Sequence, residues 1–107
     1  MKKNILLFVL LTTFNVFSQD NIPNVDLKTM EGKTISFHEV TDQNNVVIIS
    51  LWATWCVPCI NELDAISDVY EEWQEETGVE LIAVSVDDSR TVKRVKSLIN
   101  GKGWDYQ

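Results

Sequence analysis

The fold is decided by residues 46–59, which read VVIISLWATWCVPC. The first seven residues are a near-continuous run of β-branched and other apolar side chains, the pattern of a strand that is covered on both faces, as in a parallel sheet. A pair of cysteines separated by two residues follows, with Pro58 between them. These residues therefore predict a buried strand that leads into a helix carrying both cysteines.

Working outward from this stretch, polarity alternates over residues 25–30 and 34–37 on either side of Glu31-Gly32, which predicts a β-hairpin. Apolar residues then recur at helical spacing from Ile60 to Trp73, and Gly78 is the expected stop. A second buried strand is expected over 81–86, and after it a basic helix capped by Ser89 and ended by Asn100-Gly101. Residues 104–106 look like the start of another strand. This order predicts an α/β sandwich with central parallel strands joined by a right-handed crossover.

The helical periodicity also predicts which side chains enter the core. The first helix carries acidic residues opposite its apolar side, and such a face is ordinarily solvated surface. Trp73 and Trp104 are expected to be core residues. The other side chains expected to point inward are Ile60, Leu63, Ile66, Val69 and Tyr70 in the first helix, and Val92, Val95, Leu98 and Ile99 in the second.

The N-terminus has the pattern of an export signal. A short basic start precedes an apolar run over residues 5–17, and the small residues Val16 and Ser18 suit a cleavage site. The run is shorter than the roughly 20 apolar residues of a membrane span. We therefore expect a signal peptide over 1–18, a linker over 19–24 and one domain over 25–107, in an exported, periplasmic protein; an uncleaved N-terminal membrane anchor is the alternative.

The charge balance excludes some partners. Loss of Lys2 and Lys3 with the signal takes the nine basic residues to seven, against 16 acidic ones, and the formal charge from −7 to −9. A chain this acidic is unsuited to nucleic acid or to an anionic membrane surface. No nucleic acid is therefore expected as a partner, and the short apolar run at the N-terminus leaves no stable membrane span after cleavage.

The spacing of Cys56 and Cys59 suits reversible disulfide chemistry. Side chains three residues apart on a helix lie about 5–6 Å apart, within the roughly 4.4–6.8 Å between Cα atoms that a disulfide needs. Pro58 is tolerated in a first helical turn. The free N–H groups and the positive end of the helix dipole favour a thiolate at Cys56. Cys56 is therefore the expected nucleophile, and Cys59 the residue that resolves the mixed disulfide.

Three other interpretations of the cysteine pair compete with this one. A zinc half-site would need two further ligands, but the chain offers no other Cys and only His38, expected in an exposed loop at the end of the hairpin. A purely structural disulfide would close a very short loop and remove little chain entropy. Two buried, inert thiols fit poorly with a proline at a strand end. We expect neither a metal nor a cofactor.

Residues 49–59 together with Glu62, residues 84–87 and the preceding hairpin resemble the thioredoxin-like superfamily, and within it the exported TlpA/ResA-type thiol–disulfide oxidoreductases. The resemblance covers roughly residues 25–106. It implies that Trp55 flanks the active site, that Pro58 tunes the redox potential, and that Glu62, on the inward side with Cys59, helps to move protons. It also implies that the protein reduces protein disulfides in the cell envelope with electrons from an envelope donor, and that cytochrome c biogenesis is one such role.

The sequence departs from this family in two places. Family members often have Pro where this chain has Asp64. Their domain also continues beyond the position of residue 107 through two more strands, a cis-proline loop and a final helix. Against the fold that the resemblance implies, the chain therefore lacks the C-terminal strands and helix. It is either a fragment of a longer protein or a truncated remnant, and the second case includes a non-catalytic, partner-binding piece.

Overall fold

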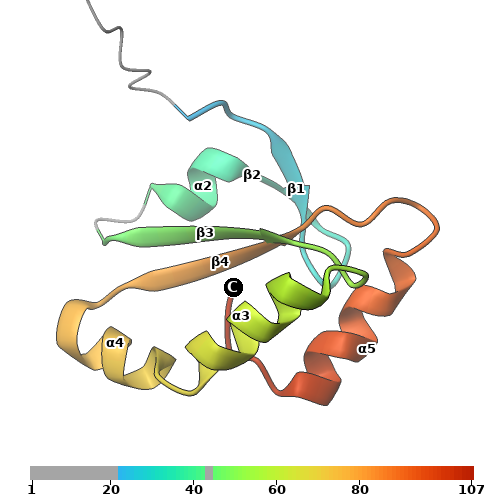
Figure 1. Cartoon of the computed structure of the whole chain (residues 1–107). Helices are drawn as coiled ribbons and strands as arrows, with labels where there is room; N and C mark the ends of the chain where they lie inside the picture. Colours follow the sequence, from blue (N-terminus) through green and yellow to red (C-terminus); the bar gives the residue numbers. More distant parts are fainter. Residues whose placement is uncertain (1–21, 43–44) are drawn as a thin grey trace, which may run out of the picture.

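Two parallel strands form the centre of the fold (Figure 1). The computed structural model describes residues 22–42 and 45–107. Strand β3 (Val47–Trp52) pairs with β4 (Glu80–Ser85) in a register that runs from Val47 opposite Glu80 to Trp52 opposite Ser85. The helices α3 (Val57–Ser67), α4 (Tyr70–Thr77) and α5 (Lys93–Lys102) lie on the same side of this pair in Figure 1. The predicted α/β arrangement with central parallel strands is confirmed.

The predicted hairpin is also present, as strands β1 (Asp26–Lys28) and β2 (Thr34–Ser36). They pair antiparallel, with Leu27 opposite Ile35. Gly32 lies in the turn with a φ of 82°, in the left-handed region where glycine carries no steric penalty. The linker predicted over 19–24 enters the described part at residue 22, and the Asn24 side chain accepts hydrogen bonds from Ser36 Oγ (2.8 Å) and from the His38 backbone N–H (3.1 Å).

A short helix that the sequence analysis did not predict follows the hairpin. This helix, α2 (Phe37–Thr41), begins where the Ser36 hydroxyl accepts the Glu39 N–H, and it buries the Phe37 ring. His38 is exposed as expected, but it lies in this helix rather than in a loop. Its Nε2 donates to the Ile22 carbonyl at 2.8 Å. A single turn of helix leaves little periodicity to detect, which explains why it was missed.

The helix expected as one element from Ile60 to Gly78 is two helices. Helix α3 ends at Ser67 with Asp68 as its C-cap, Val69 has φ −121° and ψ 0°, and α4 starts at Tyr70. The break turns Tyr70 into the core, where its hydroxyl accepts the Leu81 backbone N–H at 2.9 Å. Trp73 is consequently 37% exposed, so its predicted core position was wrong. Gly78 ends α4, as predicted, and it does so in the left-handed conformation.

The last helix starts and ends later than predicted. Ser89 does not cap it; residues 88–92 form a turn in which the Thr91 and Val92 N–H groups donate to the Asp88 carbonyl, at 3.1 and 2.9 Å. Helix α5 runs from Lys93 and is capped by Gly103, not by Asn100-Gly101. Val92, predicted to face inward, is 48% exposed because it precedes the helix.

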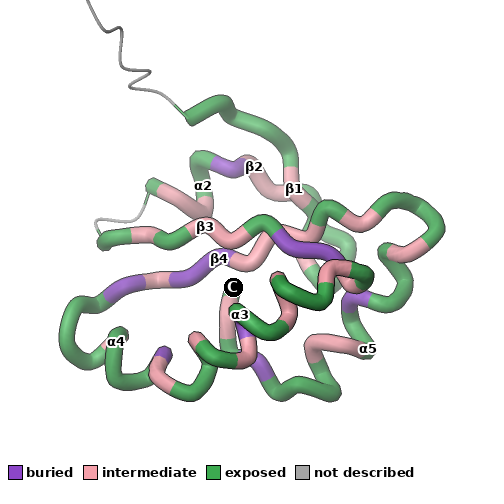
Figure 2. Tube along the Cα trace, in the orientation of Figure 1, coloured by how far each residue is buried: buried purple, intermediate pink, exposed green. Residues whose placement is uncertain are grey.

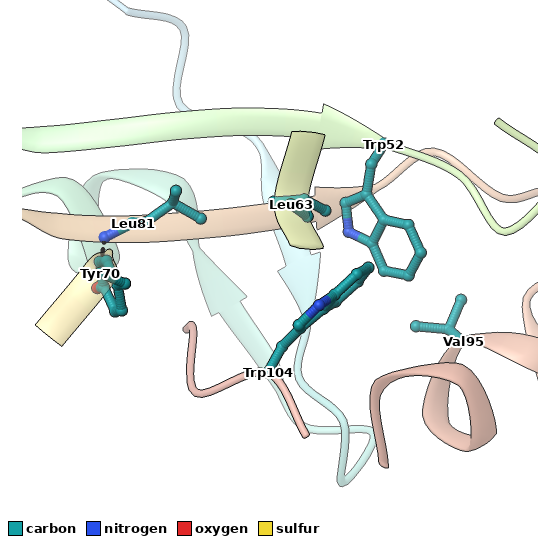
Figure 3. Close-up of a cluster of buried hydrophobic side chains, with 6 residues drawn as sticks. All are labelled: Trp52, Leu63, Tyr70, Leu81, Val95 and Trp104. Atoms are coloured by element: carbon teal, nitrogen blue, oxygen red, sulfur yellow. Dashed lines mark hydrogen bonds between the residues drawn. The ribbon is translucent and has the colours of Figure 1, made fainter. Parts of the chain in front are cut away.

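The core lies between the strand pair and the three helices. In Figure 2 the buried segments lie at the end of β3 and in the first half of β4, and they appear again where the helices face these strands. Trp52 and Trp104 meet edge to face with ring centroids 5.4 Å apart, and Tyr70 meets Tyr106 in the same way at 5.0 Å. Such aromatic pairs stabilise by about 0.5–1.5 kcal/mol beyond the area they bury. The buried cluster drawn in Figure 3 consists of Trp52, Leu63, Tyr70, Leu81, Val95 and Trp104.

The segment after α5 runs alongside β4. Gln107 N–H donates to the Leu81 carbonyl (3.2 Å), and the Gln107 carbonyl accepts the Ala83 N–H (2.8 Å). One residue that bonds in this way to both neighbours of Ile82 has the hydrogen-bond pattern of a parallel ladder. Residues 104–106 were expected to begin another strand, and the segment that contains them pairs with β4 through Gln107.

Asp64, the position where the family often has Pro, anchors this segment to α3. Its carboxylate accepts from the Trp104 indole N–H at 2.8 Å and pairs with the Lys102 ammonium group. The Lys102 hydrogen bond lowers the pKa of the Asp64 carboxyl, and the Trp104 hydrogen bond acts in the same direction. Asp64 is thus more than a solvated surface acid, because it ties the last helix and Trp104 to the helix that carries the cysteines.

The signal peptide predicted over residues 1–18 lies outside the described residues. Within residues 22–42 and 45–107, no helix has both the length and the apolar character that crossing a membrane requires.

Candidate functional site

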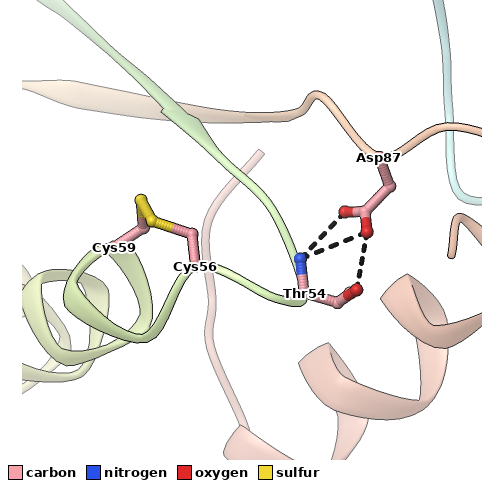
Figure 4. Close-up of a disulfide and its surroundings, with 4 residues drawn as sticks. All are labelled: Thr54, Cys56, Cys59 and Asp87. Carbon is pink, nitrogen blue, oxygen red and sulfur yellow. Dashed lines mark hydrogen bonds between the residues drawn. A yellow bond between two sulfur atoms is a disulfide. The ribbon is translucent and has the colours of Figure 1, made fainter.

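The cysteine pair follows β3 and lies at the N-terminal end of α3 (Figure 4). Cys56 is the N-cap residue, Val57 and Pro58 open the helix, and Cys59 follows in the first turn. The two cysteines are joined by a disulfide, with 5.3 Å between their Cα atoms. This separation falls within the range predicted from their spacing. Both residues are partly accessible to solvent.

The start of α3 suits an anionic sulfur. The Cys56 N–H donates to the Ala53 carbonyl at 3.0 Å, which closes a turn over residues 53–56, and the Cys56 carbonyl accepts the Ile60 N–H at 3.1 Å. Pro58 has no N–H, and no side chain caps the helix or places an acidic group in its first turn. The positive end of the helix dipole therefore acts on the Cys56 sulfur without a competing carboxylate in the first turn of α3.

Asp87 holds the loop that leads into the cysteine pair, as Figure 4 shows. The Thr54 backbone N–H donates to both oxygens of the Asp87 carboxylate, at 3.2 and 3.0 Å, and the Thr54 hydroxyl donates to Oδ1 at 2.6 Å. The Ser85 hydroxyl donates to Oδ2 at 2.6 Å. One carboxylate thus joins the segments that follow β3 and β4.

Asp87 belongs to residues 84–87, which carry part of the family resemblance, but no role was predicted for it. The feature that could have revealed the role of Asp87 is the register of β3 against β4. Thr54 and Asp87 each lie two residues beyond a strand end, and those strand ends, Trp52 and Ser85, are paired. A hydroxyl and a carboxylate at matching distances past two adjacent parallel strands are expected to meet, but only the register makes the distances match.

The hydrogen bonds keep Asp87 ionised. Burial of the carboxyl works against its charged form, but the hydrogen bonds from Ser85 and Thr54 outweigh this effect and lower the pKa of Asp87 to about 2. The carboxylate therefore accepts these hydrogen bonds throughout the pH range in which a thiol–disulfide pair works.

This depressed pKa predicts how stability depends on pH. A carboxyl whose pKa is lower in the folded than in the unfolded chain stabilises the fold above its unfolded pKa of 3.8, and this contribution disappears as the pH falls toward about 2. We expect the Asp87 contribution to be about 1–2 kcal/mol, less than full linkage gives, because solvent reaches part of the carboxylate. Urea unfolding at pH 5, 4, 3 and 2 measures it.

The matched comparison for this experiment is Asp87→Asn, which should lose stability less steeply between pH 4 and pH 2 than the wild-type chain. Equal slopes for the two proteins would show that Asp87 does not titrate with a depressed pKa.

The other candidate residues lie close to the two cysteines in the sequence, and their side chains are exposed to solvent. Trp55 and Val57, which flank Cys56, are 63% and 64% exposed, and Pro58 is also exposed. Glu62 is exposed on α3, whereas Leu63 beside it is fully buried. The expectation that Glu62 shares the inward side with Cys59 was therefore wrong, because the helix turns Leu63 and not Glu62 toward the strands.

The potential metal ligands lie apart. Within the part of the chain that the structure describes, no three His, Cys, Asp or Glu side chains are grouped in a way that could hold a metal ion. His38 in particular is engaged with the Ile22 carbonyl.

Comparison with known proteins gives consistent matches. The AhpC/TSA family profile matches residues 18–106. A protein named thiol-disulfide oxidoreductase ResA from Bacillus thuringiensis (strain Al Hakam) is 31% identical over 84 residues, covering 78% of this chain and 46% of the relative. The protein of the same name from Oceanobacillus iheyensis is 46% identical over 77 residues, covering 68% of this chain and 38% of the relative.

A solved structure shows the same fold. The solution structure of an uncharacterized thioredoxin-like protein from Porphyromonas gingivalis superposes with a TM-score of 0.69 at 48% sequence identity, covering 79% of this chain and 56% of that one. The fold is therefore thioredoxin-like. The chain spans about half the length of the relatives that it matches.

Proposed function

The chain belongs to the AhpC/TSA family, and from this premise we propose that the protein is a thiol–disulfide oxidoreductase that works through Cys56 and Cys59. The observation that carries the proposal is the disulfide between these residues at the N-terminus of α3. The names of the ResA relatives support the same class of reaction.

The reaction begins from the dithiol form. The Cys56 thiolate attacks one sulfur of a substrate disulfide, so that a Cys56–substrate bond forms and the other substrate sulfur leaves as a thiolate. Cys59, after losing its proton, then attacks the Cys56 sulfur and releases the second substrate sulfur. The substrate has gained two electrons, and the protein is left with the Cys56–Cys59 disulfide, the state present in the structure. A donor dithiol returns it to the starting form by the reverse exchange.

Three neighbours of the pair have proposed supporting roles. Trp55, exposed beside Cys56, offers an apolar surface on which a polypeptide substrate can rest. Pro58 removes one N–H from the first turn of α3 and thereby tunes the potential of the pair. Glu62, one turn after Cys59 and open to solvent, can exchange protons with water and relay them to the departing thiolates.

Within this class we propose a reductase of protein disulfides in the cell envelope. The basic and apolar pattern of residues 1–18 supports export, and an oxidising compartment supplies disulfides to reduce. An envelope electron donor would then be the partner, and the maturation of c-type cytochromes one pathway in which such a reductase serves.

The experiment that tests the proposal is alkylation of the reduced chain as a function of pH, with each cysteine followed by mass spectrometry. We expect Cys56 to react with a midpoint clearly below the free-thiol value of about 8.5, because the α3 N-terminus stabilises its thiolate, and Cys59 to react more slowly. If both cysteines react alike with a midpoint near the free-thiol value, the chain does not form a working site, and the non-catalytic interpretation holds.

A further inference from the structure

We propose that Asp87 is a positioning residue for Cys56, which fixes the turn over residues 53–56 so that the Cys56 sulfur stays at the N-terminus of α3. This inference rests on the proposed function and assigns a role that the cysteine motif does not contain. Asp87 touches neither sulfur, and its carboxylate lies on the far side of Thr54 from the disulfide in Figure 4.

The hydrogen bonds act on one residue of a single turn. The Cys56 N–H closes the turn onto the Ala53 carbonyl at 3.0 Å, so Thr54 is the first of the two residues inside it. The N–H and the hydroxyl of that residue are both held by Asp87. A backbone N–H and a side chain fixed to the same carboxylate leave Thr54 little rotational freedom, and the next fixed point along the chain is Cys56 itself.

The three hydrogen bonds from Thr54 to the Asp87 carboxylate form a clamp, and this clamp is not needed to join the two strands. The ladder already pairs Trp52 with Ser85, and the Val86 N–H donates to the Trp52 carbonyl at 2.8 Å beyond it. The strand ends therefore stay together without Asp87. What the carboxylate adds is the hold on the loop beyond the strands, which is the loop that carries Cys56.

This hold matters for the chemistry because the stabilisation of a thiolate at a helix terminus falls off within the first turn. A loosened turn lets the Cys56 sulfur move away from the helix end, and the thiolate becomes less favourable. Asp87 also carries a negative charge, which by itself disfavours a neighbouring thiolate. Positioning and charge thus predict opposite effects when Asp87 is neutralised or removed.

The experiment measures the pH midpoint and the rate of Cys56 alkylation in the reduced full chain, for the wild type, Asp87→Ala, Asp87→Asn, Thr54→Val and Thr54→Ser. Positioning predicts that Asp87→Ala raises the midpoint and slows alkylation at pH 7 by about tenfold, toward free-thiol behaviour. Thr54→Val, which keeps the charge and removes the hydroxyl hydrogen bond, should slow it by roughly threefold. Thr54→Ser, which restores a hydroxyl, should recover most of this loss, and Asp87→Asn should fall between Asp87→Ala and the wild type.

The neighbouring carboxylate supplies the control. Asp88 is exposed and bonds to Arg90 rather than to the loop, so Asp88→Asn should alkylate within about twofold of the wild type. Circular dichroism and a urea transition under the same conditions establish that each variant is folded. If Asp87→Ala does not fold, the comparison of Thr54→Val with Thr54→Ser decides whether the hydrogen bonds to Asp87 position Cys56.

Two results would overturn the proposal. Midpoints unchanged both in Thr54→Val and in the folded Asp87 variants would mean that the hydrogen bonds between Thr54 and Asp87 are only structural. A midpoint lowered by both Asp87 variants and unmoved by Thr54→Val would mean that the charge, not the position, acts on Cys56. Failure of the proposed function looks different, because the wild-type chain itself would then show no lowered midpoint.

Discussion

Cys56→Ser should abolish disulfide reduction by this protein, lowering the rate by at least about a hundredfold, since a serine hydroxyl is not ionised at neutral pH and cannot form the mixed disulfide. The chain has only two cysteines, and Cys59 lies within the first turn of α3 rather than at its N-cap, so no equivalent thiol replaces the lost one. The effect is measured by first reducing the protein with a dithiol and then recording how fast it releases thiols from a substrate protein disulfide.

Cys59→Ser is the matched control for this experiment. It leaves the nucleophile in place and removes the resolving thiol, so it should accumulate a covalent complex between Cys56 and the substrate that excess dithiothreitol releases. Substrate reduction by Cys56→Ser at the wild-type rate would contradict the assigned roles. A trapped complex in Cys56→Ser but not in Cys59→Ser would show that the roles are reversed.

Trp104→Ala should lower the free energy of unfolding by about 3–5 kcal/mol, a large part of the roughly 5–15 kcal/mol that stabilises an ordinary domain. The substitution removes the edge-to-face contact with Trp52 and the indole hydrogen bond to Asp64. It also leaves the core open at the end of α5. Urea unfolding followed by circular dichroism measures the change in midpoint.

Two further variants separate these contributions. Trp104→Phe keeps an aromatic ring and loses the hydrogen bond, and should lose about 1–2 kcal/mol. Trp55→Ala removes an indole of the same size from an exposed position and should change stability by no more than about 0.5 kcal/mol. If Trp104→Ala unfolded at the same urea concentration as Trp55→Ala, the core would not extend to Trp104.

The parts of the fold that could be predicted were those in which local pattern and packing agree. The apolar run and the alternating hairpin form the strands that their patterns predict, although β3 is not covered on both faces, since Leu51 is 64% exposed. The cysteine spacing matched the geometry at the start of α3. Trp104 was assigned to the core because its ring is large and apolar, and it does lie there.

The parts that were missed depend on contacts between distant residues. The periodicity from Ile60 to Trp73 suits one long helix, but the helix breaks at Val69, and the Tyr70 hydroxyl at the start of α4 accepts the Leu81 N–H. Asp64 resembled its acidic neighbours on the surface, and nothing local marks it as the partner of Trp104, 40 residues away. The role of Asp87 likewise follows from the register of two strands, a property that no single segment contains.

Cys56 is the N-cap residue of α3, but in the disulfide form its side chain accepts no hydrogen bond from the start of the helix. Residues with a side-chain acceptor at this position commonly stabilise a helix by about 0.5–2 kcal/mol. Reduction frees the sulfur, and we expect the thiolate to accept from the Cys59 N–H, since Pro58 has no N–H, so that opening the disulfide caps α3. Folding and reduction then belong to one thermodynamic cycle, in which each 1.4 kcal/mol or so gained by the capped dithiol makes the pair about 30 mV more oxidising. The oxidising strength of the pair can therefore be adjusted by substitutions in the first turn of α3 that leave both cysteines unchanged.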